Sequence, residues 1–313
     1  MAKAIASGSL HIEDSKFRYT LYRIKRSRSL YLLMAPFFIL FAIFTLIPVI
    51  LSLPMGFTNF DMTQFPQWVG LDNFHALFSE DEVFLKAMRN TLVFAMVTGP
   101  VSYILSFLLA WLINRMPGAL KTIFTFIFYA PTLAGNIYTT WQLIFSGDTY
   151  GILNGYMIKL GLLNGARQWL TDANYIFGAV IVVQLWMSFG AGFLAFRAGL
   201  QSIPEERYEA AAVEGVKNRM QELLMVTIPA MGPQLLFAAV MQIVASFTAG
   251  DVGRLLTSFP SADYAAHTIM THAYDYGSIR YEMGYASAIC FVLFAVMLLA
   301  DWGVKKLLER YLD

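Results

Sequence analysis

The sequence predicts an all-α integral membrane protein that crosses the bilayer as six transmembrane helices, with both termini in the cytoplasm. Of its 313 residues, 58% are hydrophobic and 14% are charged, whereas about 25% of the residues of a soluble domain are charged. Six segments are apolar over about 20 residues, the length that spans a bilayer. The six segments contain no Asp, Glu, Lys or Arg and are Leu30–Leu53, Thr91–Ile113, Thr122–Phe145, Ala173–Phe196, Ala230–Ala249 and Gly284–Ala300.

The distribution of basic residues assigns the loops to two sides. Sixteen of the 22 Lys and Arg residues fall before the first segment, between the second and third, between the fourth and fifth, or after the sixth. The other three loops together hold six. Because loops rich in Lys and Arg stay on the cytoplasmic side, both termini and the stretch 197–229 are predicted to be cytoplasmic.

The first 29 residues form a basic segment ahead of the first span. Its end, KFRYTLYRIKRSRS, mixes Lys and Arg with aromatic and aliphatic residues, which predicts a helix on the anionic inner leaflet. No A-x-A-like cleavage site follows the first span, so we expect that span to remain as a helix. The predicted division is a basic cytoplasmic segment, residues 1–29, and one transmembrane domain, residues 30–313.

Several spans contain helix breakers. Backbone groups freed at membrane depth are tolerated only where neighbouring helices or water satisfy them. These breakers therefore predict a bundle around a cavity. They are Pro36, Pro48, Gly99-Pro100, Pro131 with Gly135-Asn136, and Pro233.

The stretch between the fourth and fifth spans is predicted to form two short helices joined by a glycine. Ser202 followed by Glu205 predicts a capping box, and Glu205 and Glu206 stand where the helix dipole favours acidic side chains. Gly215 predicts the turn, and Lys217–Val226 predicts the second helix. On the first helix an aromatic and two small side chains share a face at i, i+3 and i+4 beside a carboxylate, which is typical of a helix that fits another protein's groove.

Residues in this stretch resemble the EAA motif of ABC importer permeases. The resemblance lies in Glu209-Ala210-Ala211, Gly215 and Val226–Pro229, and the flank LQSIPEERYEAA is similar to that of binding-protein-dependent sugar permeases such as the membrane subunits of the maltose transporter. The spacing from Gly215 to Pro229 is one residue longer than in that family, and TSFP at Thr257–Pro260 replaces a Gly-rich turn. Further similar strings are VGLDNF at Val69–Phe74, NTL at Asn90–Leu92, YAP at Tyr129–Pro131 and GYASA at Gly284–Ala288.

The resemblance implies that Ser202–Pro229 is a cytoplasmic coupling helix segment between the fourth and fifth transmembrane helices. It would dock in a cleft of an ATPase, with Glu209 facing a basic residue of that ATPase and Gly215 forming the turn. The implied ATPase-coupling residues are Tyr208, Glu209, Ala210, Ala211, Ala212, Gly215 and Pro229.

The resemblance also implies a multi-subunit importer in the bacterial cytoplasmic (inner) membrane. Its other components would be a second, homologous permease, two cytoplasmic ABC ATPases that bind ATP and magnesium, and an extracytoplasmic solute-binding protein. The solute would be a carbohydrate of the oligosaccharide class. The chain itself is expected to be no enzyme and to carry no cofactor, because it has no G-x-x-x-x-G-K-[ST] motif to hold ATP phosphates. The lipid bilayer is a predicted partner and nucleic acid is not.

The alternative is an ion-coupled secondary transporter of a polar solute. Such proteins keep ionisable groups at membrane depth, where a charge costs about 2.5–3.5 kcal/mol on insertion scales. Six charge-free spans argue against that class. No metal site is predicted, because the four histidines form no HExxH pair and the spacing of His267 and His272 does not suit a metal.

A path for a polar solute would be lined by uncharged polar and aromatic side chains in the spans. The same side chains can instead serve in hydrogen bonds between helices or as interfacial anchors. The candidate path residues are Asn136, Tyr138, Gln142, Gln184, Trp186, Ser188, Gln242, Ser246, Thr248, Tyr285 and Ser287.

Overall fold

The computed structural model describes residue 19, residues 22–134 and residues 137–312. Over these residues the secondary structure is helical apart from one isolated β-bridge between Thr58 and Trp68, as the sequence predicts. Most of the basic segment 1–29 and the candidate path residue Asn136 lie outside the described residues. The chain forms two compact units, Met1–Pro54 and Met55–Asp313.

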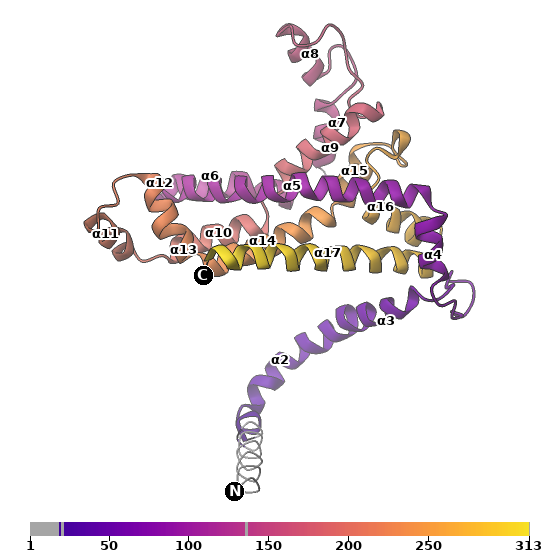
Figure 1. Ribbon diagram of the computed structural model, residues 1–313, viewed down its shortest axis with the longest axis horizontal. Coiled ribbons are helices and arrows are strands. Elements are labelled where there is room, and N and C mark those ends of the chain that lie inside the picture. Colours follow the sequence, from indigo (N-terminus) through magenta and orange to yellow (C-terminus); the bar gives the residue numbers. More distant parts are fainter. Residues whose placement is uncertain (1–18, 20–21, 135–136, 313) are drawn as a thin grey trace. The chain divides into compact units, whose positions relative to one another are not determined.

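The first unit consists of one long helical run. Helix α2 (Arg28–Phe41) passes into a π-helical turn, η1 (Ala42–Leu46), and then into α3 (Ile47–Met55) (Figure 1). Pro48 lacks an N–H, and its ring crowds the carbonyl four residues earlier, which accounts for the widened turn. The run is 28 residues long and none of its side chains is buried. The predicted span Leu30–Leu53 is therefore a helix.

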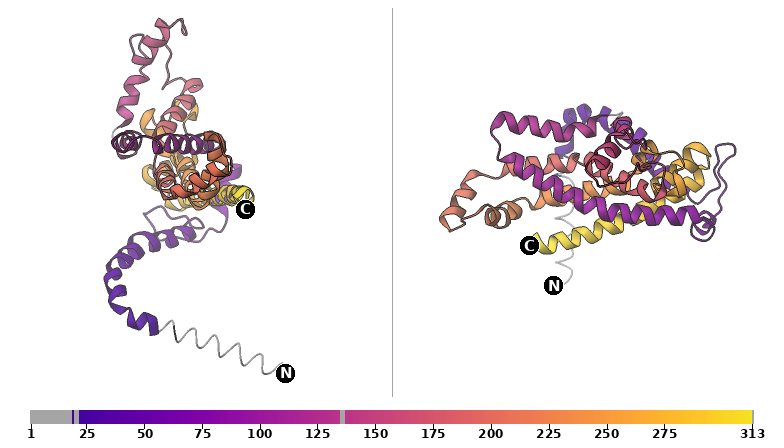
Figure 2. Two further views of the ribbon diagram at one scale, coloured as in Figure 1. Left: turned by 90° about the vertical axis from the view of Figure 1, so that its left-hand side faces the viewer. Right: turned by 90° about the horizontal axis from the view of Figure 1, so that it is seen from above.

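Three helices form the centre of the second unit. Helices α5 (Glu82–Asn114), α10 (Ala191–Ser202) and α14 (Gly232–Phe247) pack against one another (Figures 1 and 2). They share one apolar core, to which α5 contributes Phe107 and α10 contributes Phe196. These two rings meet edge to face with centroids 5.4 Å apart, a favourable aromatic geometry.

A second apolar cluster lies around the N-terminal part of α5. There α16 (Ile269–Tyr274) and α17 (Met283–Leu312) pack together, and α4 (Asp72–Ser79) packs against α5 and α17. Phe84 and Ile289 in this cluster are fully buried. The start of α5 is therefore enclosed by elements from both halves of the chain.

A third cluster joins α9 (Ala173–Met187) to α7 (Ile137–Ile144) and α15 (Gly250–Leu256). Beyond α7 the chain continues into an extension that carries α8 (Figures 1 and 2). The remaining elements are α6 (Gly118–Leu133), α8 (Ile152–Lys159), α11 (Glu205–Val213), α12 (Arg219–Glu222), η2 (Leu223–Thr227), α13 (Ile228–Ala230), η3 (Ala262–Tyr264) and η4 (Asp275–Ile279).

Four helices in the described part of the chain are long and apolar enough to cross a membrane. A fifth candidate is the pair Arg219–Ala230 and Gly232–Phe247, which is bent by 82° at Met231. Two of the four combine consecutive elements: Arg28–Met55 covers α2, η1 and α3, and Ala173–Ser202 covers α9 and α10. The other two are Glu82–Asn114, which is α5, and Met283–Leu308 in α17.

The predicted helix break at Gly99-Pro100 is absent from the structure, whereas the third predicted span is interrupted, as its helix breakers predict. Helix α5 continues through Pro100, and the absent side chain of Gly99 instead allows close packing, since a Cβ there would lie 3.4 Å from Ser246 Oγ. The third predicted span, Thr122–Phe145, is divided between α6 and α7. At 1.5 Å per residue α6 alone is about 24 Å long, less than the roughly 30 Å of a bilayer core.

Candidate functional site

The first arm of the predicted coupling segment is α11. Pro204 is its N-cap residue, in extended conformation, and Glu205 and Glu206 occupy its first turn, where the helix dipole favours them. The predicted capping box of Ser202 and Glu205 is wrong. Ser202 is the last residue of α10, and its hydroxyl donates to the carbonyl of Gly199 at 2.8 Å.

Gly215 ends α11 and turns the chain. Its φ is +98°, a left-handed conformation that side chains with a Cβ disfavour. The N–H of Gly215 donates to Ala212 and the N–H of Val216 donates to Ala211, at 3.2 and 3.0 Å. These two bonds make a Schellman motif, so the predicted turn at Gly215 is present.

The second arm starts with its own capping interaction. The side chain of Asn218 accepts from the N–H of Gln221 at 2.8 Å, and the side chain of Gln221 accepts from the N–H of Lys217 at 3.0 Å. Helix α12 then runs through η2 into α13 without a gap. The π-turn η2 precedes Pro229, as η1 precedes Pro48, and for the same steric reason.

The two arms pack together through a small interface. Ala211 is buried, and the hydroxyl groups of Tyr208 and Thr227 lie 3.3 Å apart. In the helical hairpin that the two arms form, residues 205–230, Glu209, Ala210 and Ala212 are exposed. The motif therefore divides into side chains that hold the arms together and side chains left free to meet a partner.

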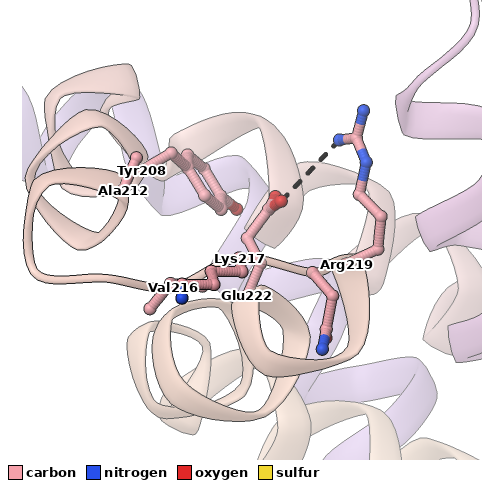
Figure 3. Close-up of a pocket in the computed structure, with 7 residues that line it drawn as sticks. Tyr208, Ala212, Val216, Lys217, Arg219 and Glu222 are labelled. Carbon is pink, nitrogen blue, oxygen red and sulfur yellow. Dashed lines mark ion pairs between the residues drawn. The ribbon is translucent and has the colours of Figure 1, made fainter.

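Between the arms lies an open hollow of about 370 Å³ (Figure 3). Glu222 lies on its wall, where the Oε2 atom is 3.7 Å from Nη1 of Arg219. Apolar side chains are also exposed nearby, since Val213 is 89% and Met225 68% exposed. The hollow is lined by Tyr208, Ala212, Val216, Lys217, Asn218, Arg219 and Glu222.

Several candidate path residues have protein partners. The amide of Gln142 donates to the carbonyl of Leu255 in α15 at 2.9 Å, which ties α7 to α15. Ser188 and Thr248 donate to carbonyl groups of their own helices, at 2.6 and 2.7 Å. These three residues have structural roles in this conformation.

The aromatic candidates lie together with other aromatic side chains. Trp186 of α9 meets Trp141 of α7 edge to face with centroids 5.4 Å apart, and Trp141 stacks on Phe145. Tyr138, half-buried, packs against the same cluster. Two of the predicted path residues, Tyr138 and Trp186, therefore lie beside aromatic side chains of α7 and α9.

The remaining candidates are dispersed. Gln184 of α9 is buried, as are Gln242 and Ser246 of α14. Ser246 donates to the carbonyl of Ile243 at 3.0 Å, and Nε2 of Gln242 is buried without a partner among the described residues. Ser287 is half-buried near the start of α17. These positions do not converge on one site.

The sequence reasoning missed a polar network at the start of α5. Asp81 is the N-cap of α5 and accepts from the N–H of Phe84 at 2.8 Å. Its Oδ2 lies 2.9 Å from Nε2 of His272 and accepts from the hydroxyl of Tyr285 at 3.0 Å. His272 Nδ1 in turn lies 3.0 Å from Nε2 of His267. No local signal connects these residues, because Asp81 and His272 are 191 positions apart.

Burial determines the charges in this network. It lowers the pKa of His267 to about 4 and also lowers the pKa of His272, although Asp81 opposes the shift of His272. Burial alone would raise the pKa of Asp81, but the hydrogen bonds from Phe84 and His272 bring it below its usual value. At neutral pH both imidazoles are therefore neutral and Asp81 is ionised, so Nε2–H of His272 donates to Asp81 and Nε2–H of His267 donates to Nδ1 of His272.

Comparison with known families gives this helical arrangement a context. Residues 91–312 match the family described as "Binding-protein-dependent transport system inner membrane component". The chain belongs to this family. It is therefore a multi-pass permease component of an importer in the inner membrane, a class of subunit that is not itself catalytic.

Two curated relatives cover most of the chain. One is the "Probable ABC transporter permease protein YesP" of Bacillus subtilis, 29% identical over 88% of this chain and 90% of the relative. The other is the "Arabinooligosaccharides transport system permease protein AraP" of the same organism, 28% identical over 97% of each chain.

Two solved structures share the fold. A bacterial ABC transporter involved in the import of the acidic polysaccharide alginate aligns with a TM-score of 0.76 and 25% identity, over 94% of this chain and 100% of that chain. A second structure, the alginate transporter in complex with an alginate pentasaccharide-bound periplasmic protein, aligns with the same score at 24% identity, over 93% of this chain and 98% of that chain.

Proposed function

We propose that this chain is one of two permease subunits of an ATP-driven ABC importer for a carbohydrate of the oligosaccharide class. The α11–α12 hairpin carries the proposal, because it exposes Glu209 and Ala210 on a helix that ends in a glycine turn. The oligosaccharide class is supported by the names of the arabinooligosaccharide and alginate transporters.

The proposed topology has six spans, with both termini and the hairpin in the cytoplasm. Support comes from the 16 basic residues that this arrangement places on the inner side. The α6–α7 pair would make the third span and α14 the fifth. The extension with α8 and the network at Asp81 would then face the outside.

In the proposed assembly, ATP and magnesium bind to two separate cytoplasmic ATPase subunits. Each permease offers its hairpin to one ATPase, and closure of the ATPase pair moves the hairpins and opens the membrane path alternately to either side. A solute-binding protein delivers the carbohydrate from outside. The second permease is a homologous but different chain.

The residues that would meet the ATPase are the exposed members of the motif. Glu209 would face a basic ATPase residue, with Ala210 and Ala212 giving a narrow surface that fits a cleft. Tyr208 and Ala211 would keep the arms together, since both face the second arm. Gly215 and Pro229 would set the turn and the end of the second arm.

A direct test is to purify the tagged chain from its native membranes in mild detergent and to identify the proteins that accompany it. We expect an ATPase with a Walker motif, a second permease and ATP hydrolysis. Glu209→Ala should weaken ATPase retention and uptake while the protein remains in the membrane. The matched control is Glu206→Ala, which removes another exposed acid of α11. A chain that purifies alone, without hydrolysis even after gentle crosslinking, would contradict the proposal.

Transport can be followed with a defined probe. A panel of labelled oligosaccharides, including arabino- and galacto-oligosaccharides, is screened for retention by the binding protein of the complex, and the retained compound is named the probe oligosaccharide. We expect uptake of this probe into proteoliposomes to require ATP on the side of the membrane where the hairpin lies.

A further inference from the structure

The end of α5 that lies beside the hairpin carries an ion pair across 107 positions of sequence. Arg115, the C-cap residue of α5, places Nη2 2.6 Å from Oε1 of Glu222 in α12. The two side chains are 28% and 22% exposed, so the pair is partly shielded from solvent. A cation at this helix end is also favoured by the helix dipole.

Neighbouring groups hold Arg115 in place. Its guanidinium lies over the ring of Trp111, 5.1 Å from the ring centroid, within the range of a cation–π contact. One residue before it, Asn114 accepts from the buried Arg197 of α10 at 3.2 Å. Arg115 is thus oriented by α5 itself and turned toward the hairpin.

The second arm also joins the apolar core to which α5 contributes. Leu223, next to Glu222, is buried in the core cluster that contains Ile113 of α5. The hairpin is covalently continuous with α10 and α14 only, and the chain bends by 82° between its second arm and α14. The ion pair with Arg115 connects the arm to α5 across this bend.

We propose that the Arg115–Glu222 ion pair makes α5 move together with the coupling hairpin, so that Arg115 and Glu222 are positioning residues for energy coupling. This inference rests on the proposed function of the hairpin. Helix α5 is 33 residues long, about 50 Å at 1.5 Å per residue, and reaches from the hairpin to the network at Asp81. Motion of the hairpin is carried along this helix to the opposite side of the membrane. The pair stays closed during the cycle and acts as a rigid link.

The pair of Glu222 with Arg219 provides a matched control. Arg219 lies on the same arm as Glu222, at 3.7 Å, and is 74% exposed. Its ion pair connects the arm only to itself. Reversal of its charge removes an interaction of the same carboxylate without loosening the hairpin from α5.

The test uses the complex purified from native membranes and reconstituted in proteoliposomes, with Arg115→Glu, Glu222→Arg and the double variant. The quantity measured is the number of probe oligosaccharide molecules taken up per ATP hydrolysed. We expect each single reversal to lower this ratio about fivefold while hydrolysis continues, and the double variant to return to within about twofold of the original ratio. Arg219→Glu should leave the ratio unchanged.

An unchanged ratio in both single variants would overturn the inference, and so would a double variant that stays as defective as the single ones. Size-exclusion chromatography shows whether each complex is intact. Where a reversal prevents assembly, the uncharged isostere Glu222→Gln takes its place. It should lower the ratio at least about twofold, and an unchanged ratio again refutes the link. Glu209→Ala is measured alongside: if that variant keeps full ATPase docking and uptake, the proposed function of the hairpin fails rather than the link.

Discussion

The two ends of α5 are held by opposite kinds of interaction. At its start, Asp81 lies in a buried network with two neutral histidines and a tyrosine. At its end, Arg115 makes one ion pair with a partly exposed glutamate of the hairpin. A buried hydrogen-bonded network is costly to break, because each orphaned group stays unsolvated. A single ion pair that is partly exposed contributes less stability. We therefore interpret the start of α5 as an anchor and its end as a connection whose role is in transmission.

The largest expected effect is the loss of the anchor. Asp81→Ala removes the N-cap of α5 and leaves His272 and Tyr285 without their acceptor, so we expect a loss of about 3 kcal/mol of unfolding free energy. Thermal melting in detergent, followed by intrinsic fluorescence, measures it. Asp172→Ala is the matched control: Asp172 caps α9 by accepting from the N–H of Asn174, and its loss should cost only about 1 kcal/mol. Equal shifts for both variants would show that the network adds nothing to the cap.

The anchor should also make stability depend on pH. The folded pKa of His267 is about 4 against a usual 6.5. Below pH 6.5 the unfolded chain therefore binds a proton at His267 that the folded chain does not bind. Stability is complete above pH 6.5 and falls toward pH 4, by about 1 kcal/mol per pH unit. The other titratable groups that act on this ring are His272, Asp275, Asp81 and Arg280.

Melting temperatures between pH 7.5 and 5 test this dependence. His267→Gln should make the slope smaller, because one of the two histidines with a lowered pKa is removed. His75→Gln removes an exposed histidine, 75% accessible, and should leave the slope as it is. A slope that persists in His267→Gln would assign the pH dependence to other groups.

A smaller effect is expected at the turn of the hairpin. Gly215→Ala places a Cβ on a residue with φ +98°, at a cost of about 1 kcal/mol. No atom lies within 4 Å of the added carbon, so the cost comes from the backbone alone. The strain is local to the hairpin, and ATPase retention should weaken. Gly303→Ala lies in α17, also with open space around it, and should be neutral or slightly stabilising. Normal retention with Gly215→Ala would show that the turn need not be left-handed.

The smallest expected change in stability concerns the other end of α5. Glu222→Gln removes the charge of the pair but keeps the shape of the side chain, so we expect a loss of about 0.5–1 kcal/mol. The same detergent melting experiment measures it. A loss as large as that of Asp81→Ala would mean that both ends of α5 are anchors, and the distinction between them would disappear.

The features predicted correctly from the sequence are those set by local patterns. Long apolar runs predicted α5 and α17 correctly, because a helix satisfies the backbone groups of a membrane-spanning segment within the segment itself. The hairpin was predicted from Glu205, Glu206 and Gly215, whose effects act within a turn of their own position. The predicted cap at Ser202 was wrong because α10 extends farther than its apolar part and takes that residue as its own last turn.

The features that were missed depend on contacts between distant segments. Asp81 meets His272, and Arg115 meets Glu222, only after α5 has packed against the second half of the chain. Gly99-Pro100 has the composition of a break, yet α5 continues through it, and the missing side chain of Gly99 leaves room for Ser246 of α14. Candidate path residues such as Gln142 and Tyr285 have hydrogen-bond partners that polarity alone does not reveal.

The most direct measurement of the central claim is uptake of the probe oligosaccharide into proteoliposomes that contain the whole complex. The two energy sources are supplied separately, as ATP on the hairpin side or as a proton or sodium gradient without ATP. The account predicts uptake that requires ATP and the binding protein, persists when ionophores collapse the gradients, and falls sharply in Glu209→Ala. Uptake driven by an ion gradient without ATP, and equal in Glu209→Ala, would contradict it and favour an ion-coupled secondary transporter.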